Sequence, residues 1–167
     1  MEFEIIPKTE SNESYDSSAI AVKSIAYDLS LTEYEEGEIT NSVISDVLED
    51  IRKGSDIFFY LDPNGETDFL NVLSGHGWIS LFAQLFDEQT DEDISYICYN
   101  PEFEHTKEMP ETDTSFSDML YTPLDLGGQS PVPKMQALTD IEAGIKAAEY
   151  FIRTGKLSTD INWLRAE

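Results

Sequence analysis

Carboxylates are the chemical group in surplus in this chain. Its 167 residues include 34 Asp and Glu but only ten Lys and Arg, which gives a formal net charge of −24. Carboxylates in proteins bind calcium, work in pairs as acid and base in glycosidases, or form an electrostatic surface for a cationic partner. The spacing of the acids and their positions along the chain discriminate between these uses.

The excess negative charge is regional. Residues 54–133 carry sixteen acids and the single base Lys107, residues 1–53 carry thirteen acids and four bases, and residues 134–167 carry five of each. A negative field this concentrated repels phosphate backbones and anionic lipid, so it favours a cationic partner and argues against direct binding of nucleic acid or membrane. Because the bias also extends through strand-like segments, we interpret it as an electrostatic surface.

Two acidic patterns offer alternatives. The stretch 87–93 is the best calcium candidate, but it lacks the alternating acids and the glycine of an EF-hand loop. The pairs Glu102 with Glu104 and Asp62 with Asp68 could serve a hydrolase, which needs a fixed separation inside a cleft. These pairs fall in predicted turns and loops. A carboxylate-dependent hydrolase and an acidic calcium-binding module stay open as alternatives, and we assign no catalytic residue, metal ligand or cofactor.

The other reactive side chains are few. His76 and His105 are the only imidazoles and Cys98 is the only thiol, and no zinc or serine-hydrolase motif is present. We expect His76 in a surface turn between two glycines, and Cys98 as a buried, inert thiol within a strand. One cysteine, an acidic first segment and the lack of a long apolar run predict a soluble protein of a reducing compartment, most simply the cytoplasm.

Two segments have helical periodicity. Apolar residues from Val43 to Ile51 form one face of a helix, with Thr40 or Ser42 as its N-cap and Gly54 at its end. The second helix begins at a Thr139-x-x-Glu142 capping box and ends at residues 153–156. Its apolar stripe consists of Ile141, Ile145, Ala148 and Ile152.

Short strands separated by turns account for much of the rest. Turns at 62–65 and 75–77 predict hairpins, and the segment 78–86 has aromatic residues on one face and aliphatic residues on the other, so we expect a central strand covered on both faces. The expected strands are 3–6, 19–29, 57–61, 67–73, 78–86, 94–99, 119–126 and 161–163.

The sum is an α+β fold with a mostly antiparallel sheet and two main helices, in a single domain spanning residues 1–167. We expect the Ser- and Glu-rich segment 9–18, within residues 1–18, to be mobile, and residues 100–118 to form a long acidic loop.

The segment Glu149-Tyr150-Phe151-Ile152-Arg153-Thr154-Gly155-Lys156-Leu157, followed by Ile161-Asn162-Trp163, carries a family resemblance. It resembles the closing Phe-x-x-Thr-Gly … Val-x-Trp pattern of the first, widespread family of bacterial immunity proteins to polymorphic and contact-dependent growth inhibition toxins. The order of hairpin, Gly-rich turn and aromatic strand upstream is similar too, so the resemblance covers residues 40–165. It implies a non-enzymatic protein that binds a cognate toxin C-terminal domain in the bacterial cytoplasm and blocks its active site or substrate channel.

The charge of this chain indicates which toxin it would suit. Nucleases are commonly basic because they must hold phosphates, so we expect a basic toxin domain, most simply a nuclease. Acidic contacts are expected at Asp87, Glu88, Asp91, Glu92, Asp93, Glu102, Glu104, Glu108, Glu111 and Asp113, with exposed aromatic anchors at Tyr99, Phe103 and Phe116. Fold maintenance, and not contact, is expected of Trp78, Phe151, Gly155 and Trp163.

Overall fold

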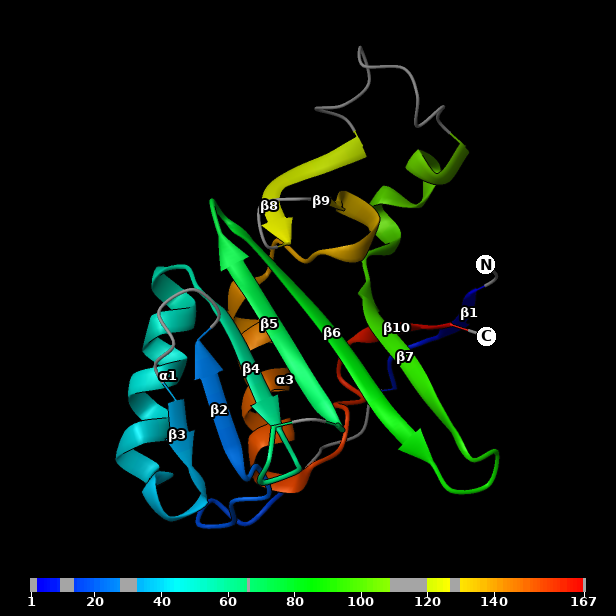
Figure 1. The fold of residues 1–167 in the computed structure, drawn as a ribbon. Coiled ribbons are helices and arrows are strands. Elements are labelled where there is room, and N and C mark those ends of the chain that lie inside the picture. Colours follow the sequence, from blue (N-terminus) through cyan, green and yellow to red (C-terminus); the bar gives the residue numbers. More distant parts are fainter. Residues whose placement is uncertain are drawn as a thin grey trace.

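An eight-stranded antiparallel sheet organises the chain, in the strand order β1-β10-β7-β6-β5-β4-β2-β3 (Figure 1). The computed structural model describes residues 3–9, 14–27, 33–65, 67–108, 120–126 and 130–166. The strands of this sheet are β1 (Phe3–Ile6), β2 (Ser24–Tyr27), β3 (Glu33–Glu35), β4 (Asp56–Tyr60), β5 (Phe69–Gly75), β6 (Trp78–Asp87), β7 (Glu92–Tyr99) and β10 (Asn162–Ala166). The predicted α+β fold with an antiparallel sheet and a single domain is confirmed.

Strands β4 to β7 follow one another as hairpins, so the centre of the sheet is built from local pairings. The predicted turns at 62–65 and 75–77 are present. Gly75, His76 and Gly77 all have positive φ, at 150°, 53° and 83°, which explains why two of these three positions are glycine. The exposed position of His76 agrees with the expected turn histidine. Strand β6 lies between β5 and β7, in the interior of the sheet as predicted.

Helices α1 (Asn41–Lys53) and α3 (Ile141–Thr154) pack on one face of the sheet. Helix α1 is capped as predicted, since the Thr40 hydroxyl accepts a hydrogen bond from the Val43 N–H at 3.2 Å. The predicted cap of α3 is wrong by one residue. Asp140, and not Thr139, accepts the Ala143 N–H at 3.1 Å, because its carboxylate is the one placed to reach the third N–H of the helix.

The main core lies between these helices and the sheet, and its largest fully buried side chains include Phe59, Phe151, Ile79 and Leu81. Trp163 is 4% exposed, and its indole N–H donates to the Ser158 carbonyl at 2.8 Å. Phe151 and Trp163 are therefore packed as expected of residues that maintain the fold. Gly155 ends α3 in the left-handed conformation, at φ 73°.

Among the residues that the structure describes, those packed on the opposite face of the sheet lie at one end of it. A small sheet of β8 (Tyr121–Leu126) and β9 (Ser130–Pro133), followed by the 3-10 turn η4 (Lys134–Gln136), packs there and forms a second apolar cluster of Leu73, Leu124, Val132 and Ala137. Trp78 packs partly buried against this cluster. The expectation that both faces of β6 are covered is therefore only half right, because Phe86 at its far end is 46% exposed. We call this side of the sheet the open face.

Several element predictions needed correction. The expected strand 19–29 shortens to β2, since residues 21 and 22 bond instead to the Ile152 carbonyl at the end of α3. Part of the expected acidic loop forms the 3-10 helix η2 (Pro101–Glu108), while residues 109–119 lie outside the described residues. The short strands β3 and β9 were not predicted. Of the segment expected to be mobile, residues 10–13 are not described, and Asp16 accepts two hydrogen bonds from Ser18.

Candidate functional site

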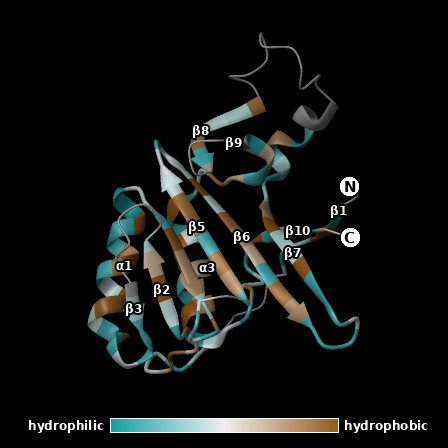
Figure 2. Cartoon of the chain, in the orientation of Figure 1, coloured by the Kyte–Doolittle hydropathy of each residue, from teal (hydrophilic) through white to brown (hydrophobic). Residues whose placement is uncertain are grey.

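The predicted acidic turn is a single unit at the tip of the β6–β7 hairpin, shown as the hydrophilic end of that hairpin in Figure 2. Asp91 adopts φ 57°, its N–H donates to the Asp87 carbonyl at 2.9 Å, and the Asp87 carboxylate accepts the Gln89 N–H at 2.9 Å. The other four acids, Glu88, Asp91, Glu92 and Asp93, are exposed. We call these five acids the acidic tip.

The acidic tip works against the stability of the hairpin. Asp87 lies directly opposite Glu92 in the strand register, and like charges in that position destabilise a strand pair. The tip therefore concentrates charge where folding alone would select opposite charges or neutral residues. Residues that break a local rule of stability are often found where function requires them.

The second predicted contact group lies at the other end of β7. Strand β7 runs from Glu92 to Tyr99, a length of about 23 Å at roughly 3.3 Å per residue, so the structure does not bring the two groups together. Tyr99 is only 4% exposed, and the prediction of an exposed anchor there is wrong. Glu102 is exposed and Glu104 half-buried. Glu111, Asp113 and Phe116 lie outside the described residues, as does the side chain of Glu108.

Phe103 is engaged within the protein. Its ring lies 5.6 Å from that of Trp78, centre to centre, and the Lys134 ammonium lies 5.7 Å from the centre of the Phe103 ring. These contacts attach η2 to the start of β6 and to η4. Phe103 therefore has a packing role in the structure, whatever it contributes to a partner.

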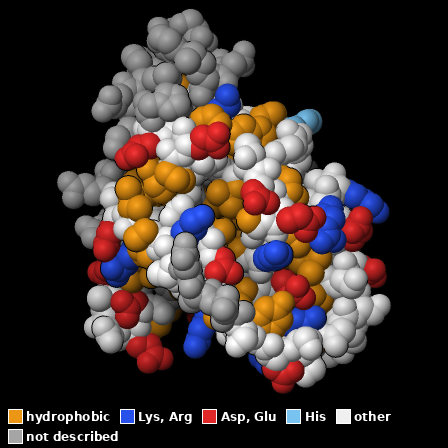
Figure 3. All heavy atoms as spheres, turned by 180° about the vertical axis from the view of Figure 1, so that it is seen from behind, with side chains coloured by type: hydrophobic (Ala, Val, Ile, Leu, Met, Phe, Trp, Pro, Cys, Tyr) orange, Lys and Arg blue, Asp and Glu red, His pale blue; other side chains and the backbone are white. Residues whose placement is uncertain are grey.

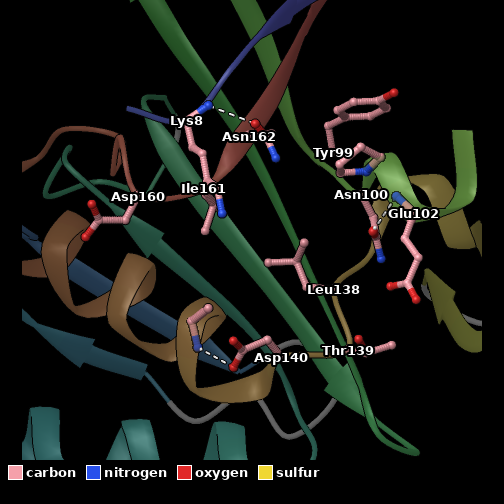
Figure 4. A pocket seen from close by; sticks show the side chains of 12 residues that line it. Lys8, Tyr99, Asn100, Glu102, Leu138, Thr139, Asp140, Asp160, Ile161 and Asn162 are labelled. Carbon is pink, nitrogen blue, oxygen red and sulfur yellow. Dashed lines mark hydrogen bonds between the residues drawn. The ribbon is translucent and has the colours of Figure 1, made fainter. Parts of the chain in front are cut away.

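The polar cavity in Figure 4 is the place where the alternative of a carboxylate enzyme can be examined. It measures about 340 Å³ and is lined by Lys8, Glu102, Asp140 and Asp160 among others. The three carboxylates come from η2, the cap of α3 and the segment before β10. Asp140 already caps the helix, and in Figure 4 the Asp160 carboxylate points away from the other labelled residues. The cavity does not present an evident acid and base pair.

The other carboxylate alternatives gain no support from the described part of the chain. The Asp68 carboxylate accepts the Phe86 N–H at 2.6 Å, and the Asp62 carboxylate accepts the Asn64 N–H at 3.1 Å. Each of these two acids therefore has a local backbone partner. Within the described residues, no group of three or more His, Cys, Asp or Glu side chains is arranged to hold a metal ion. In the same residues, no helix is both long and apolar enough to cross a membrane.

Cys98 is buried in β7, as predicted. Its sulfur accepts the Leu81 N–H and approaches the Gln136 carbonyl, both at 3.3 Å. Burial raises the pKa of the Cys98 thiol to about 11. The thiolate that a nucleophile needs is therefore scarce at neutral pH.

A row of aromatic rings on the open face was not predicted from the sequence. The rings of Phe58, Tyr60, Phe69 and Phe82 contact one another with centres 5.7–6.1 Å apart. All four are only partly buried. The alternation of residues in β4 and β5 places these aromatic side chains on one face of the sheet. Periodicity alone does not show whether another element covers that face.

Acids lie beside the end of this aromatic row. Phe86 is directly opposite Asp93 in the strand register, and its N–H bonds to Asp68. An exposed ring next to carboxylates attracts a guanidinium or ammonium group, which binds to the face of the ring and to the carboxylate together. The end of the open face at Phe86, next to the acidic tip, is therefore chemically suited to Lys and Arg side chains.

Basic side chains are concentrated elsewhere. Between residues 54 and 133 the structure describes no Lys or Arg side chain, and Lys134 of η4, at the covered end of the open face, lies against the Phe103 ring. Arg52, Lys53, Lys146 and Arg153 lie on the two helices. Figure 3, seen from behind, shows Lys and Arg mixed with Asp and Glu over the helix side. Aromatic sheets can stack nucleic-acid bases, but they require positive charge for the phosphates. The few bases described on the open face give it little positive charge with which to hold phosphates.

A search with protein-family models found no match for this chain, and searches among curated proteins and among solved structures found none either. The comparisons therefore add no family, partner or activity to what the residues themselves indicate.

Proposed function

We propose that this chain is an immunity-type protein that binds and neutralises a basic toxin domain, most simply a nuclease, in the bacterial cytoplasm. The observation that carries the proposal is the separation of charge across the fold. The acidic tip and the adjoining end of the open face carry acids and aromatic rings, and the base Lys134 lies at the opposite, covered end against Phe103. The basic side chains on α1 and α3 lie on the other side of the sheet. The resemblance of residues 149–163 to the closing motif of an immunity-protein family supports the same role.

The acidic tip and the open face have different roles in this proposal, because one is charged and exposed and the other is aromatic and partly buried. The exposed acidic tip steers a cationic domain, because complementary charge can raise association from about 10⁵–10⁶ to about 10⁸–10⁹ M⁻¹s⁻¹ at low salt. The partly buried rings of the open face supply the desolvated contacts that carry most of the affinity in protein interfaces. A protein of this kind needs no catalytic residue, and occupation of the toxin's substrate groove is sufficient for neutralisation.

The first test is capture of the partner. The tagged chain is used to recover proteins from its native cells at low and at about 0.5 M salt, where charges a few ångströms apart are strongly screened. We expect one basic protein with a toxin-like C-terminal domain. That domain should stop growth when it is expressed alone and should be harmless when it is expressed with this chain. Growth arrest that persists on co-expression refutes neutralisation.

The second test isolates the charge. A tip variant carries Glu88→Gln, Asp91→Asn, Glu92→Gln and Asp93→Asn, and a control variant with the same net charge carries Glu36→Gln, Asp46→Asn, Glu49→Gln and Asp160→Asn away from the tip. Association with the captured domain should slow about tenfold or more at low salt in the tip variant and no more than about twofold in the control. Equal rates in the two variants would remove the steering role.

A further inference from the structure

Two apolar cavities lie side by side on the open face. One of about 410 Å³ has Phe58, Phe69 and Phe82 in its floor and Pro131 to Pro133 in its wall. The other, of about 340 Å³, reaches Phe3 and Ala166 at the edge of the sheet. Both are lined by Phe82, Ile97 and Gln136, so they meet over the middle of the sheet. We call the pair the apolar groove.

The dimensions of the apolar groove select the shape of its occupant. It extends from β4 to β1 across β5, β6, β7 and β10. Five strand spacings of about 4.8 Å give a length of about 24 Å, which corresponds to about seven residues of extended chain at roughly 3.3 Å each. The groove can therefore hold a short extended segment whose side chains enter the two cavities.

Gln136 gives the apolar groove a polar contact. Gln136 lines both cavities, and among the described residues no hydrogen bond to its side-chain amide is found, although its backbone carbonyl accepts from Ser80 at 2.8 Å. A carboxamide offers two donor hydrogens and one acceptor oxygen. An extended backbone presents free N–H and C=O groups to such a side chain, whereas a helix uses these groups internally.

The charges near the apolar groove indicate which residues the bound segment should carry. The end of the open face toward the acidic tip carries Asp68 and Asp93 beside the exposed Phe86 ring. Aromatic rings with neighbouring carboxylates favour Lys and Arg. A second copy of this chain brings a further net charge of −24, which opposes its docking here.

From these observations we propose that the apolar groove binds an extended segment of about seven residues in the cationic partner. Apolar side chains of the segment occupy the two cavities, and its backbone groups bond to the Gln136 amide. A Lys or Arg of the segment is directed toward Phe86, Asp68 and Asp93. This inference rests on the proposed function, since it names the part of the toxin domain that the open face recognises. It also gives the residues of β9 and η4 that line the groove a role in binding, which the acidic tip alone does not provide.

The test uses a phage-displayed library of random twelve-residue peptides selected on the intact protein. Selected peptides should combine apolar residues with Lys or Arg. Ser95→Trp places a large side chain in the cavity that Ser95 lines, and it should weaken their binding about tenfold or more. Gln136→Leu preserves the approximate size of the side chain and removes its amide, and it should weaken binding about fivefold, as expected for one lost hydrogen bond.

Ser45→Trp is the matched control, because Ser45 is exposed on α1 on the other side of the molecule. It should bind the peptides as the original protein does. Gln136→Leu keeps the proposal testable if Ser95→Trp does not fold, which circular dichroism reports. A library that yields no binder, or binders equally tight on Gln136→Leu and on a folded Ser95→Trp, overturns the groove proposal. So does a concentration-dependent dimer that Ser95→Trp disrupts, since a second copy is then the occupant.

The two proposals fail in different ways. If the captured toxin domain is neutralised while no groove-dependent peptide is found, the proposed function stands and the groove proposal falls. If peptides bind in the groove but no toxin domain is captured or neutralised, the groove is a peptide site and the immunity function falls.

Discussion

Helix α3 lies close against the sheet at Gly144, and this contact yields a quantitative prediction. A Cβ added at Gly144 would lie 2.7 Å from both the Cδ1 and Cγ2 atoms of Ile79 and 3.2 Å from its Cγ1 atom. Ile79 is fully buried in β6, so its side chain has little room to move. A methyl group at position 144 must therefore displace α3, or force Ile79 from its rotamer.

Two opposing terms set the size of the effect of Gly144→Ala. Alanine in a helix interior is favoured over glycine by about 1 kcal/mol, while overpacking a core costs about 1–3 kcal/mol. We expect the substitution to lower the free energy of unfolding by about 0–2 kcal/mol. In an Ile79→Ala background the clashing atoms are gone, so the same substitution should raise it by about 1 kcal/mol.

Urea unfolding followed by circular dichroism, on the original protein, both single variants and the double variant, measures this coupling. Ile79→Ala alone should cost about 2–5 kcal/mol, which a domain of ordinary stability tolerates. Gly37→Ala is the matched control, because a Cβ there meets no atom within 4 Å, and it should not lower stability. If Gly144→Ala stabilises both backgrounds equally, within about 0.5 kcal/mol, the close approach of α3 to β6 is wrong.

Three further outcomes are expected. Trp163→Phe removes the buried hydrogen bond from the indole N–H to the Ser158 carbonyl and should lower the free energy of unfolding by about 1–3 kcal/mol in urea titrations, because a buried hydrogen bond and part of a buried side chain are lost; an unchanged midpoint contradicts this. Burial and a pKa raised to about 11 should leave Cys98 unreactive toward a thiol reagent at pH 8, with reaction appearing only in urea; fast labelling of the folded protein would disprove the assignment. The Tyr27 hydroxyl donates to Asp50 at 2.6 Å, and burial, with this contact, raises its pKa above the usual value of 10.0. The folded state then keeps a proton that the unfolded chain loses, so this contribution to stability is complete below pH ~10 and declines above it. Urea unfolding at pH 8 to 11 should show a shallower alkaline decline for Tyr27→Phe, and an identical decline counts against this role.

Local patterns were sufficient for the elements that carry their own signals. Helix α1 was predicted from its apolar period and its Thr40 cap, and the turn at residues 75–77 from its glycines, because caps and positive φ are local requirements. Strand β3 has the sequence Glu-Tyr-Glu and β9 contains two prolines. A strand of three residues is too short for its alternation to stand out from a loop, and prolines remove ladder donors, so both strands pair only because tertiary contacts place a neighbour beside them.

The candidate site was predictable only where its residues are consecutive. The acidic tip was found because its members lie within one turn. Its separation from Glu102 and Glu104 depends on the length of β7 between them, and the burial of Tyr99 depends on neighbours distant in sequence. The apolar groove was beyond reach for the same reason, since it joins Phe3, Phe82 and Gln136, which come from segments far apart in the chain.

The pairing of β1 with β10 has a consequence for the order in which the molecule assembles. The β4–β7 hairpins join neighbours along the chain, whereas the Lys8 N–H reaches the Asn162 side chain across 154 positions, and both chain ends lie at the same edge in Figure 1. Closing so long a loop is entropically costly, and non-local pairings slow folding. We expect the hairpins to form first and the β1–β10 edge to dock last.

The strands that dock last are also expected to exchange their amide hydrogens soonest, because local opening needs less free energy there than in the hairpins. Phe3 of β1 and Ala166 of β10 form one end of the apolar groove. A segment bound in the groove would thus connect the slow-docking edge to the fast-forming centre. An occupied protein would then open at this edge less often than an empty one, and its lifetime against proteolysis would depend on its partner.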